Sequence, residues 1–251
     1  MSAPLVDAAG GATFPAMRSR IGVLASGGGS NLQAILDYQD RLGIAGAGAV
    51  VLVVANTPRA GALDRARARG IATAVVERHD DAAALQDALD AQRVDLVVLA
   101  GYLKLVPAAV VARFAGRMLN VHPALLPAFG GPGMYGRRVH EAVLRSGARV
   151  SGVTVHFVDE AYDRGAIVAQ WPVPVWNDDT PDALAARVLR AEHLLLPRVV
   201  ALVAAGRVAL GPDGRVDAGG PPATRLDAPP EMFALADDDA AASGIARSLR
   251  L

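Results

Sequence analysis

Short apolar runs alternate along this chain with longer stretches in which apolar residues return at helical spacing. Residues 20–25 (RIGVLA), 50–55 (VVLVVA) and 94–100 (VDLVVLA) are almost entirely apolar, which is typical of central strands in a parallel sheet covered on both faces. The segments between these runs fit amphipathic helices. The alternation predicts an α/β fold with a doubly wound, mostly parallel sheet.

The other elements follow from the same pattern and from residues that begin and end helices. Further strands are expected at 71–76 and 117–121, and helices from about 32, at 60–69, from 80 or 81 to 92, at 107–114 and at 137–146. Residues 150–175 contain two more strand-like runs, which predict an antiparallel hairpin added to the parallel core. A long C-terminal helix is expected over 180–205, because Thr-Pro-Asp is a typical helix start.

Both ends of the chain differ from this regular middle. Residues 1–19 are rich in Ala, Gly and Pro and show no period, so we expect a flexible N-terminal extension. Residues 20–210 are expected to form one domain, with a short strand near 207–210. Residues 211–251 are rich in Gly, Pro, Asp and Ala and are expected to form a poorly ordered tail.

Composition narrows the class of protein. The chain has 25 Lys and Arg against 25 Asp and Glu, so it has no general attraction for nucleic acid or anionic membranes. It has no cysteine, which excludes disulfides and thiolate chemistry, and its five histidines lack metal-site spacing, so no metal is expected. No apolar run is long enough to cross a membrane and no signal peptide is evident, so a cytoplasmic protein is expected.

A glycine-rich loop, residues 26–31 (SGGGSN), joins the first strand to the first helix. Glycines allow backbone N–H groups to approach an anion, and the helix N-terminus favours negative charge, so this layout is typical of a phosphate site. Ser30 or Asn31 is expected to cap the helix. A tight glycine turn without a ligand is the alternative.

The kind of phosphate can be narrowed. A dinucleotide motif starting at Gly27 would need glycine where Leu32 stands, and the next strand ends at Asn56 rather than at an acidic residue. No lysine follows the loop, so it is not a nucleoside triphosphate loop. A single phosphomonoester therefore suits it better.

Asn120 and His122 stand two residues apart at the end of an apolar strand, followed by prolines. That spacing places both side chains on one face, where they could stabilise an oxygen that gains negative charge during acyl transfer. A carboxylate from the acidic segment 159–163 would orient the imidazole and favour its protonated form. With no nucleophile evident, direct attack by a substrate amine is the simplest chemistry. The alternative is that both are ordinary loop residues.

The glycine-rich segment 129–136 suits a flap over such a site, or a plain surface loop.

Several motifs together resemble phosphoribosylglycinamide formyltransferase of purine biosynthesis, the folate-dependent kind. They are SGGGSNLQAI (26–35), VVLAGYLKLVP (97–107), MLNVHPALLP (118–127), SGVTVHFVDEAYDRGAIVAQ (151–170) and ARVLRAEHLLLP (186–197). The resemblance covers residues 20–210 and implies a Rossmann-like formyltransferase fold. It also implies transfer of the formyl group of 10-formyltetrahydrofolate, the co-substrate, to the amine of glycinamide ribonucleotide, with small molecules as the only partners.

The same resemblance implies roles for individual residues. Asn120 and His122 would stabilise the oxyanion, with His122 as proton donor, and Asp163 would hold His122 and a proton-relaying water. The nucleotide phosphate and ribose would contact Gly29, Ser30, Asn31 and Glu192. The folate would contact Leu103, Lys104, Leu105, Val106, Asp159, Glu160, Ala161 and Tyr162.

Three alternatives remain at this point. A methionyl-tRNA formyltransferase would need a second, basic domain, and the tail is short and not basic. A formyltetrahydrofolate deformylase would usually carry an N-terminal regulatory domain, and only about twenty residues precede the first strand. A non-catalytic nucleotide sensor on the same fold would not need Asn120, His122 and Asp163 together. The oligomeric state, monomer or homodimer, is left open.

Overall fold

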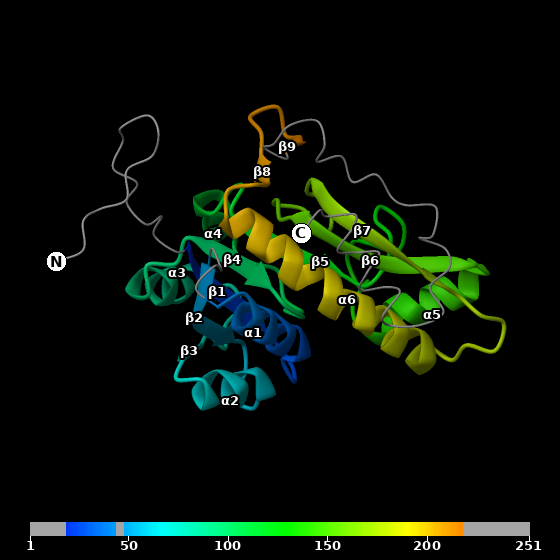
Figure 1. Cartoon of the computed structure of the whole chain (residues 1–251), viewed down its shortest axis with the longest axis horizontal. Helices are drawn as coiled ribbons and strands as arrows, with labels where there is room; N and C mark the ends of the chain where they lie inside the picture. Colours follow the sequence, from blue (N-terminus) through cyan, green and yellow to red (C-terminus); the bar gives the residue numbers. More distant parts are fainter. Residues whose placement is uncertain (1–18, 44–47, 218–251) are drawn as a thin grey trace.

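The computed structural model describes residues 19–43 and 48–217, which form a central sheet flanked by helices (Figure 1). In chain order the elements are β1 (Ser19–Ala25), α1 (Ser30–Leu42), β2 (Gly48–Ala55), α2 (Gly61–Ala68), β3 (Ala72–Val75), α3 (Ala82–Ala91), β4 (Leu96–Leu99), α4 (Ala108–Arg113), β5 (Met118–His122), α5 (Arg137–Ser146), β6 (Val150–Phe157), β7 (Ile167–Pro174), α6 (Pro181–Ala204), β8 (Ala209–Leu210) and β9 (Val216–Asp217). The predicted alternation of strands and helices is confirmed, with bounds shifted by a few residues.

The large sheet has the strand order β3-β2-β1-β4-β5-β6-β7. Strands β1 to β5 pair in parallel, and β6 and β7 pair antiparallel, which confirms the added hairpin. The order reverses between β1 and β4, and ligands of such sheets bind in the crevice beyond the carboxyl ends of the strands at this point. The loops after these two strands are joined there, since Ser26 N–H donates to Gly101 O at 3.1 Å and Leu103 N–H donates to Ser26 Oγ at 3.0 Å.

Helices cover both faces of the sheet, which explains why its inner strands are apolar throughout. On one face α1 and α6 pack together through fully buried side chains such as Leu32 and Leu195, and Figure 1 shows α6 running across the sheet beside α1. On the other face α3 and α4 contribute Leu89 and Val110, with Phe114 just after α4. Each such side chain contributes about 1.5–3 kcal/mol by its removal from water.

Polar side chains define several helix ends. Thr180 caps α6, because its Oγ1 accepts from Ala183 N–H at 3.1 Å, and Asp81 caps α3 by accepting from Ala84 N–H at 3.0 Å. The expected cap of α1 by Ser30 or Asn31 is wrong. Both residues lie inside α1, and Gly29 precedes it with no side-chain cap.

The outer parts of the described chain also correct the predicted bounds. Strand β1 begins at Ser19, and β8 pairs with β9, so residues 211–217 belong to a short hairpin rather than to a tail. The rest of the predicted extension and tail, residues 1–18 and 218–251, lies outside the described residues. Within the described ranges, no helix is both long enough and apolar enough to cross a membrane.

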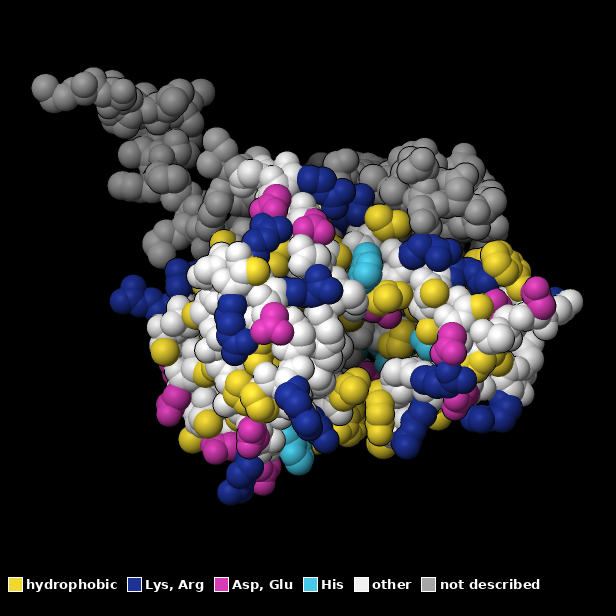
Figure 2. Space-filling model, turned by 90° about the horizontal axis from the view of Figure 1, so that it is seen from below, with side chains coloured by type: hydrophobic (Ala, Val, Ile, Leu, Met, Phe, Trp, Pro, Cys, Tyr) yellow, Lys and Arg dark blue, Asp and Glu magenta, His cyan; other side chains and the backbone are white. Residues whose placement is uncertain are grey.

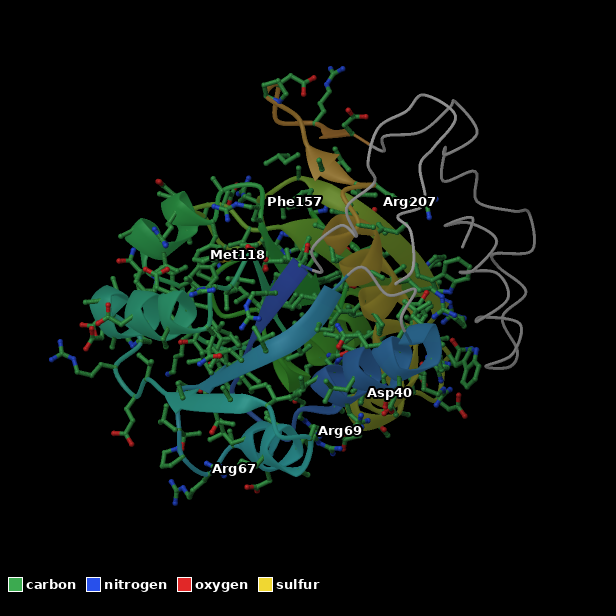
Figure 3. The ribbon with its side chains drawn as sticks, turned by 60° about the vertical axis from the view of Figure 1, so that its left-hand side comes forward. Asp40, Arg67, Arg69, Met118, Phe157 and Arg207 are labelled. Carbon is green, nitrogen blue, oxygen red and sulfur yellow. The ribbon has the colours of Figure 1, made fainter. Side chains whose placement is uncertain are left out.

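At the surface, Arg69 follows α2 and pairs with Asp40 of α1 at 2.6 Å (Figure 3).

Candidate active site

A cavity of about 570 Å³ opens at the carboxyl ends of the parallel strands. Figure 2 shows this part of the molecule hollowed, with histidine and acidic side chains in its depth. The predicted site residues that line it are Gly29, Ser30, Asn31, Leu103, Lys104, Leu105, Val106, Asn120, His122, Asp159, Ala161, Tyr162, Asp163 and Glu192. The structure thus brings together residues that lie far apart in the sequence.

The glycine loop forms one end of the cavity. Gly29 has φ of 75°, and a β-carbon there would lie 2.7 Å from the Ala62 Cα, so only glycine fits. Helix α1 starts at Ser30, directly after this glycine, and its first backbone N–H groups and its dipole favour an anion at this end. Arg65 Nε donates to Gly28 O at 2.7 Å, so this hydrogen bond joins the glycine loop to α2.

A buried pair, Asn31 and Glu192, lies beside this loop. Asn31 Nδ2 donates to Glu192 Oε2 at 2.6 Å, which joins α1 to α6. Burial raises the pKa of the Glu192 carboxyl to about 7, and the hydrogen bond from Asn31 opposes this rise. The phosphate contact of Asn31 stays a prediction, and it concerns the backbone N–H in the first turn of α1, because the side chain amide donates to Glu192.

The polar centre of the cavity contains the three side chains expected there. Asp163 Oδ1 lies 3.5 Å from Asn120 Nδ2, and its Oδ2 lies 3.6 Å from His122 Nδ1. Asp163 also accepts a hydrogen bond from Gly131 N–H at 2.8 Å, and its backbone has a φ of 54°. Asp163, rather than Asp159, is thus the carboxylate that faces the pair on β5.

Burial and charge act on His122 in opposite directions. Its side chain is 4% exposed, and burial lowers the pKa of the imidazole more than Asp163 and the Phe129 carbonyl raise it. The carboxylate raises the pKa of His122, as predicted, but the desolvation of the charged ring is the larger effect. His122 Nε2 lies 2.9 Å from Phe129 O.

His156 belongs to the same group, although the sequence did not single it out. The pairing of β5 with β6 places His156 directly opposite Asn120. Its Nδ1–H donates to Phe157 O at 2.8 Å, so its Nε2 is left to accept from Asn120 Nδ2 at 3.1 Å. His156 therefore orients the Asn120 amide. The sequence feature that could have indicated His156 is the alternation of β6, which places His156 on the same face of the strand as Thr154.

The opposite end of the cavity is more apolar and more open. Leu103 and Leu105 are 48% and 42% exposed and line the cavity with Tyr162, so together they offer apolar surface to a flat ring. Lys104 supplies a cation at the same place. Glu160 does not line the cavity and is exposed, because the turn closed by Ala161 N–H on Asp159 Oδ1 leaves it in solvent. Its predicted folate contact is not supported.

Comparisons with known proteins agree with this geometry. Residues 19–200 match the family model described as formyl transferase, so the fold and site define an enzyme that transfers formyl groups. The chain is 44% identical over 211 residues to the chloroplastic phosphoribosylglycinamide formyltransferase of Arabidopsis thaliana, covering 81% of this chain and 72% of that protein. It belongs to the phosphoribosylglycinamide formyltransferase family.

Two further relatives extend this picture. The solved structure of glycinamide ribonucleotide transformylase 1 from Symbiobacterium toebii superposes with a TM-score of 0.73 and 40% identity, over 80% of this chain and 94% of that one. The trifunctional purine biosynthetic protein adenosine-3 of Drosophila melanogaster is 42% identical over 78% of this chain, which spans 15% of that longer protein. These matches place the family in purine biosynthesis.

Proposed function

We propose that the chain transfers the formyl group of 10-formyltetrahydrofolate to the primary amine of glycinamide ribonucleotide, releasing the N-formyl nucleotide and tetrahydrofolate. The observation that carries this proposal is one cavity that joins the glycine loop at the start of α1 to an apolar end, with Asn120, His122 and Asp163 between them. Each end suits one substrate, and the polar centre suits the chemistry between them.

The nucleotide fits the end formed by the glycine loop. Its phosphate would accept hydrogen bonds from the backbone N–H groups of Gly29, Ser30 and Asn31, where the dipole of α1 is favourable. Its ribose hydroxyls would donate to Glu192, which the Asn31 amide holds in place. Bound in this way, the nucleotide would present its amine toward β5.

The folate fits the apolar end. Its ring would pack on Leu103, Leu105 and Val106, with Lys104 close to its negatively charged tail. The segment that carries Asp159, Ala161 and Tyr162 would border the ring on the other side. The formyl carbon would then lie between the two ends, within reach of the polar centre.

Attack of the amine on the formyl carbon forms a C–N bond and places negative charge on the formyl oxygen. Asn120 uses one amide hydrogen on His156 and has its second only loosely directed at Asp163, so this second hydrogen is available to the oxygen. His122 in its protonated form supplies the other donor. Its burial makes the imidazolium a stronger acid, since the pKa of the ring is lowered.

Proton movement then completes the transfer. Asp163 accepts the proton that the attacking amine loses, through a bridging water. His122 delivers a proton to the leaving nitrogen of the folate as its C–N bond breaks. The amine loses one proton and the leaving nitrogen gains one, so no metal or redox partner enters the balance.

A spectrophotometric assay for tetrahydrofolate tests this function. Product should form only when glycinamide ribonucleotide is present, and the His122→Ala and Asp163→Asn variants should lose turnover while still binding the nucleotide. Equal product in the control without nucleotide would instead indicate a hydrolase. Undiminished turnover in both variants would refute the proposed chemistry.

A further inference from the structure

The backbone carbonyl of Phe129 is directed at the catalytic imidazole from the loop that follows β5. Phe129 O lies 2.9 Å from His122 Nε2. A carbonyl can only accept a hydrogen bond, so Nε2 must carry a hydrogen. In the neutral ring Nδ1 is then the unprotonated nitrogen, and this is the atom that faces Asp163 at 3.6 Å.

The same loop also reaches the carboxylate. Gly131 N–H donates to Asp163 Oδ2 at 2.8 Å. Between these two contacts, a β-carbon at Gly130 would lie 3.2 Å from the Asp163 β-carbon and 2.5 Å from Leu126 Cδ2, so the backbone passes directly against the carboxylate residue. Residues 129–131 thus contact both His122 and Asp163.

The conformation of Phe129 explains the direction of its carbonyl. Its φ is 56°, a region that residues with a β-carbon adopt rarely and that tends to be retained where the surroundings determine it. Its ring is partly buried and packs against the main hydrophobic core. The left-handed backbone turns the carbonyl toward β5.

We propose that Phe129 is a positioning residue, whose left-handed backbone fixes the Nε2–H tautomer of His122 so that the ring exchanges protons with the reacting groups through Nδ1. The inference rests on the proposed role of His122 as the proton donor. The Phe129 carbonyl occupies Nε2 of the ring, so Nδ1 is the nitrogen that remains to reach the formyl oxygen.

The groups around His122 also act on its protonated form. The titratable groups that interact with it are Asp163 on the loop after β6, His140 on α5 and His156 on β6. Phe129 O and Asp163 both raise the pKa of His122 against the larger effect of burial. The carbonyl therefore stabilises the charged ring as well as orienting the neutral one.

Nitrogen-15 NMR of the histidine rings tests the tautomer without any substrate. The His122 signals are identified by their loss in His122→Gln. Above the pKa of the ring, the wild-type protein should show a protonated Nε2 and an unprotonated Nδ1. The opposite tautomer would overturn the inference, whether or not formyl transfer is observed, and absence of transfer with the expected tautomer would count against the proposed function alone.

Variants of Phe129 test the cause. Phe129→Pro forces φ to about −65° and turns the carbonyl away, so it should remove the tautomer preference and lower kcat about 100-fold, with little change in the KM for the nucleotide. Phe129→Gly keeps the carbonyl and allows the same φ, and should keep the tautomer. A folded Phe129→Pro protein with the wild-type tautomer and kcat would refute the proposal.

Arg93→Pro is the matched control. Arg93 lies between α3 and β4, away from the cavity, and has a comparable φ of 48°. Its replacement should cost stability without changing the His122 tautomer or kcat. If Phe129→Pro does not fold, the wild-type spectrum and Phe129→Gly still decide the question.

Discussion

Replacing Glu192 with glutamine should stabilise the folded protein at neutral and alkaline pH while it weakens nucleotide binding. The Glu192 side chain is buried, and its hydrogen-bond partner in the structure is Asn31, which donates at 2.6 Å. A glutamine oxygen can accept the same hydrogen bond without carrying a charge. The carboxylate is therefore a group whose proposed role at the ribose opposes stability.

The size of this effect follows from the pKa. Burial raises the pKa of Glu192 from its ordinary 4.5 to about 7, so between these values the folded state binds more protons than the unfolded state. Stability then falls as pH rises through this window and stays constant above it. One pKa unit corresponds to about 1.4 kcal/mol, so the wild-type protein should lose about 3 kcal/mol relative to Glu192→Gln.

Urea denaturation of both proteins, near pH 4 and again near pH 8, measures this difference. The two free energies of unfolding should lie close together at the lower pH, where the carboxyl is mostly neutral in both states, and separate by about 3 kcal/mol at the higher pH. If the difference between the two free energies of unfolding does not change with pH, or favours the wild-type protein at high pH, burial does not destabilise the Glu192 carboxylate.

Substitutions at three other positions test separate parts of the site. His122→Ala should lower kcat about 100-fold or more in steady-state assays, because it removes the proposed proton donor, and calorimetry should show that nucleotide binding is retained. Gly29→Ala should raise the KM for the nucleotide, since its β-carbon would meet Ala62 at 2.7 Å, whereas Gly70→Ala, with a similar positive φ and no neighbour within 4 Å, should leave that KM unchanged. His156→Leu should lower kcat by releasing the Asn120 amide, and an unchanged kcat would show that His156 does not orient it.

Features with local causes could be predicted from the sequence. The apolar runs predicted the central strands, and the Thr-Pro-Asp start predicted α6, because these signals lie within a few residues of the elements that they define. The placement of the glycine loop and of Asn120 and His122 at strand ends also followed, since parallel strands bring their carboxyl ends to one edge.

Features that depend on distant partners could not be predicted in this way. The side chain of Asn31 is bonded to Glu192 on α6 instead of capping its own helix, and the two residues lie far apart in the sequence. His156 joined the site only through the register of β6 against β5. The lowered pKa of His122 required knowledge of its burial, which no spacing in the sequence expresses.

Isotope tracing tests the central claim most directly. The donor folate would carry carbon-13 in its formyl group, and the products formed with glycinamide ribonucleotide would be followed by NMR. The label should appear in a formamide on the nucleotide amine, in equal amount to the tetrahydrofolate released. Label recovered as free formate, with the nucleotide unchanged, would mean that water is the acceptor and would contradict the account.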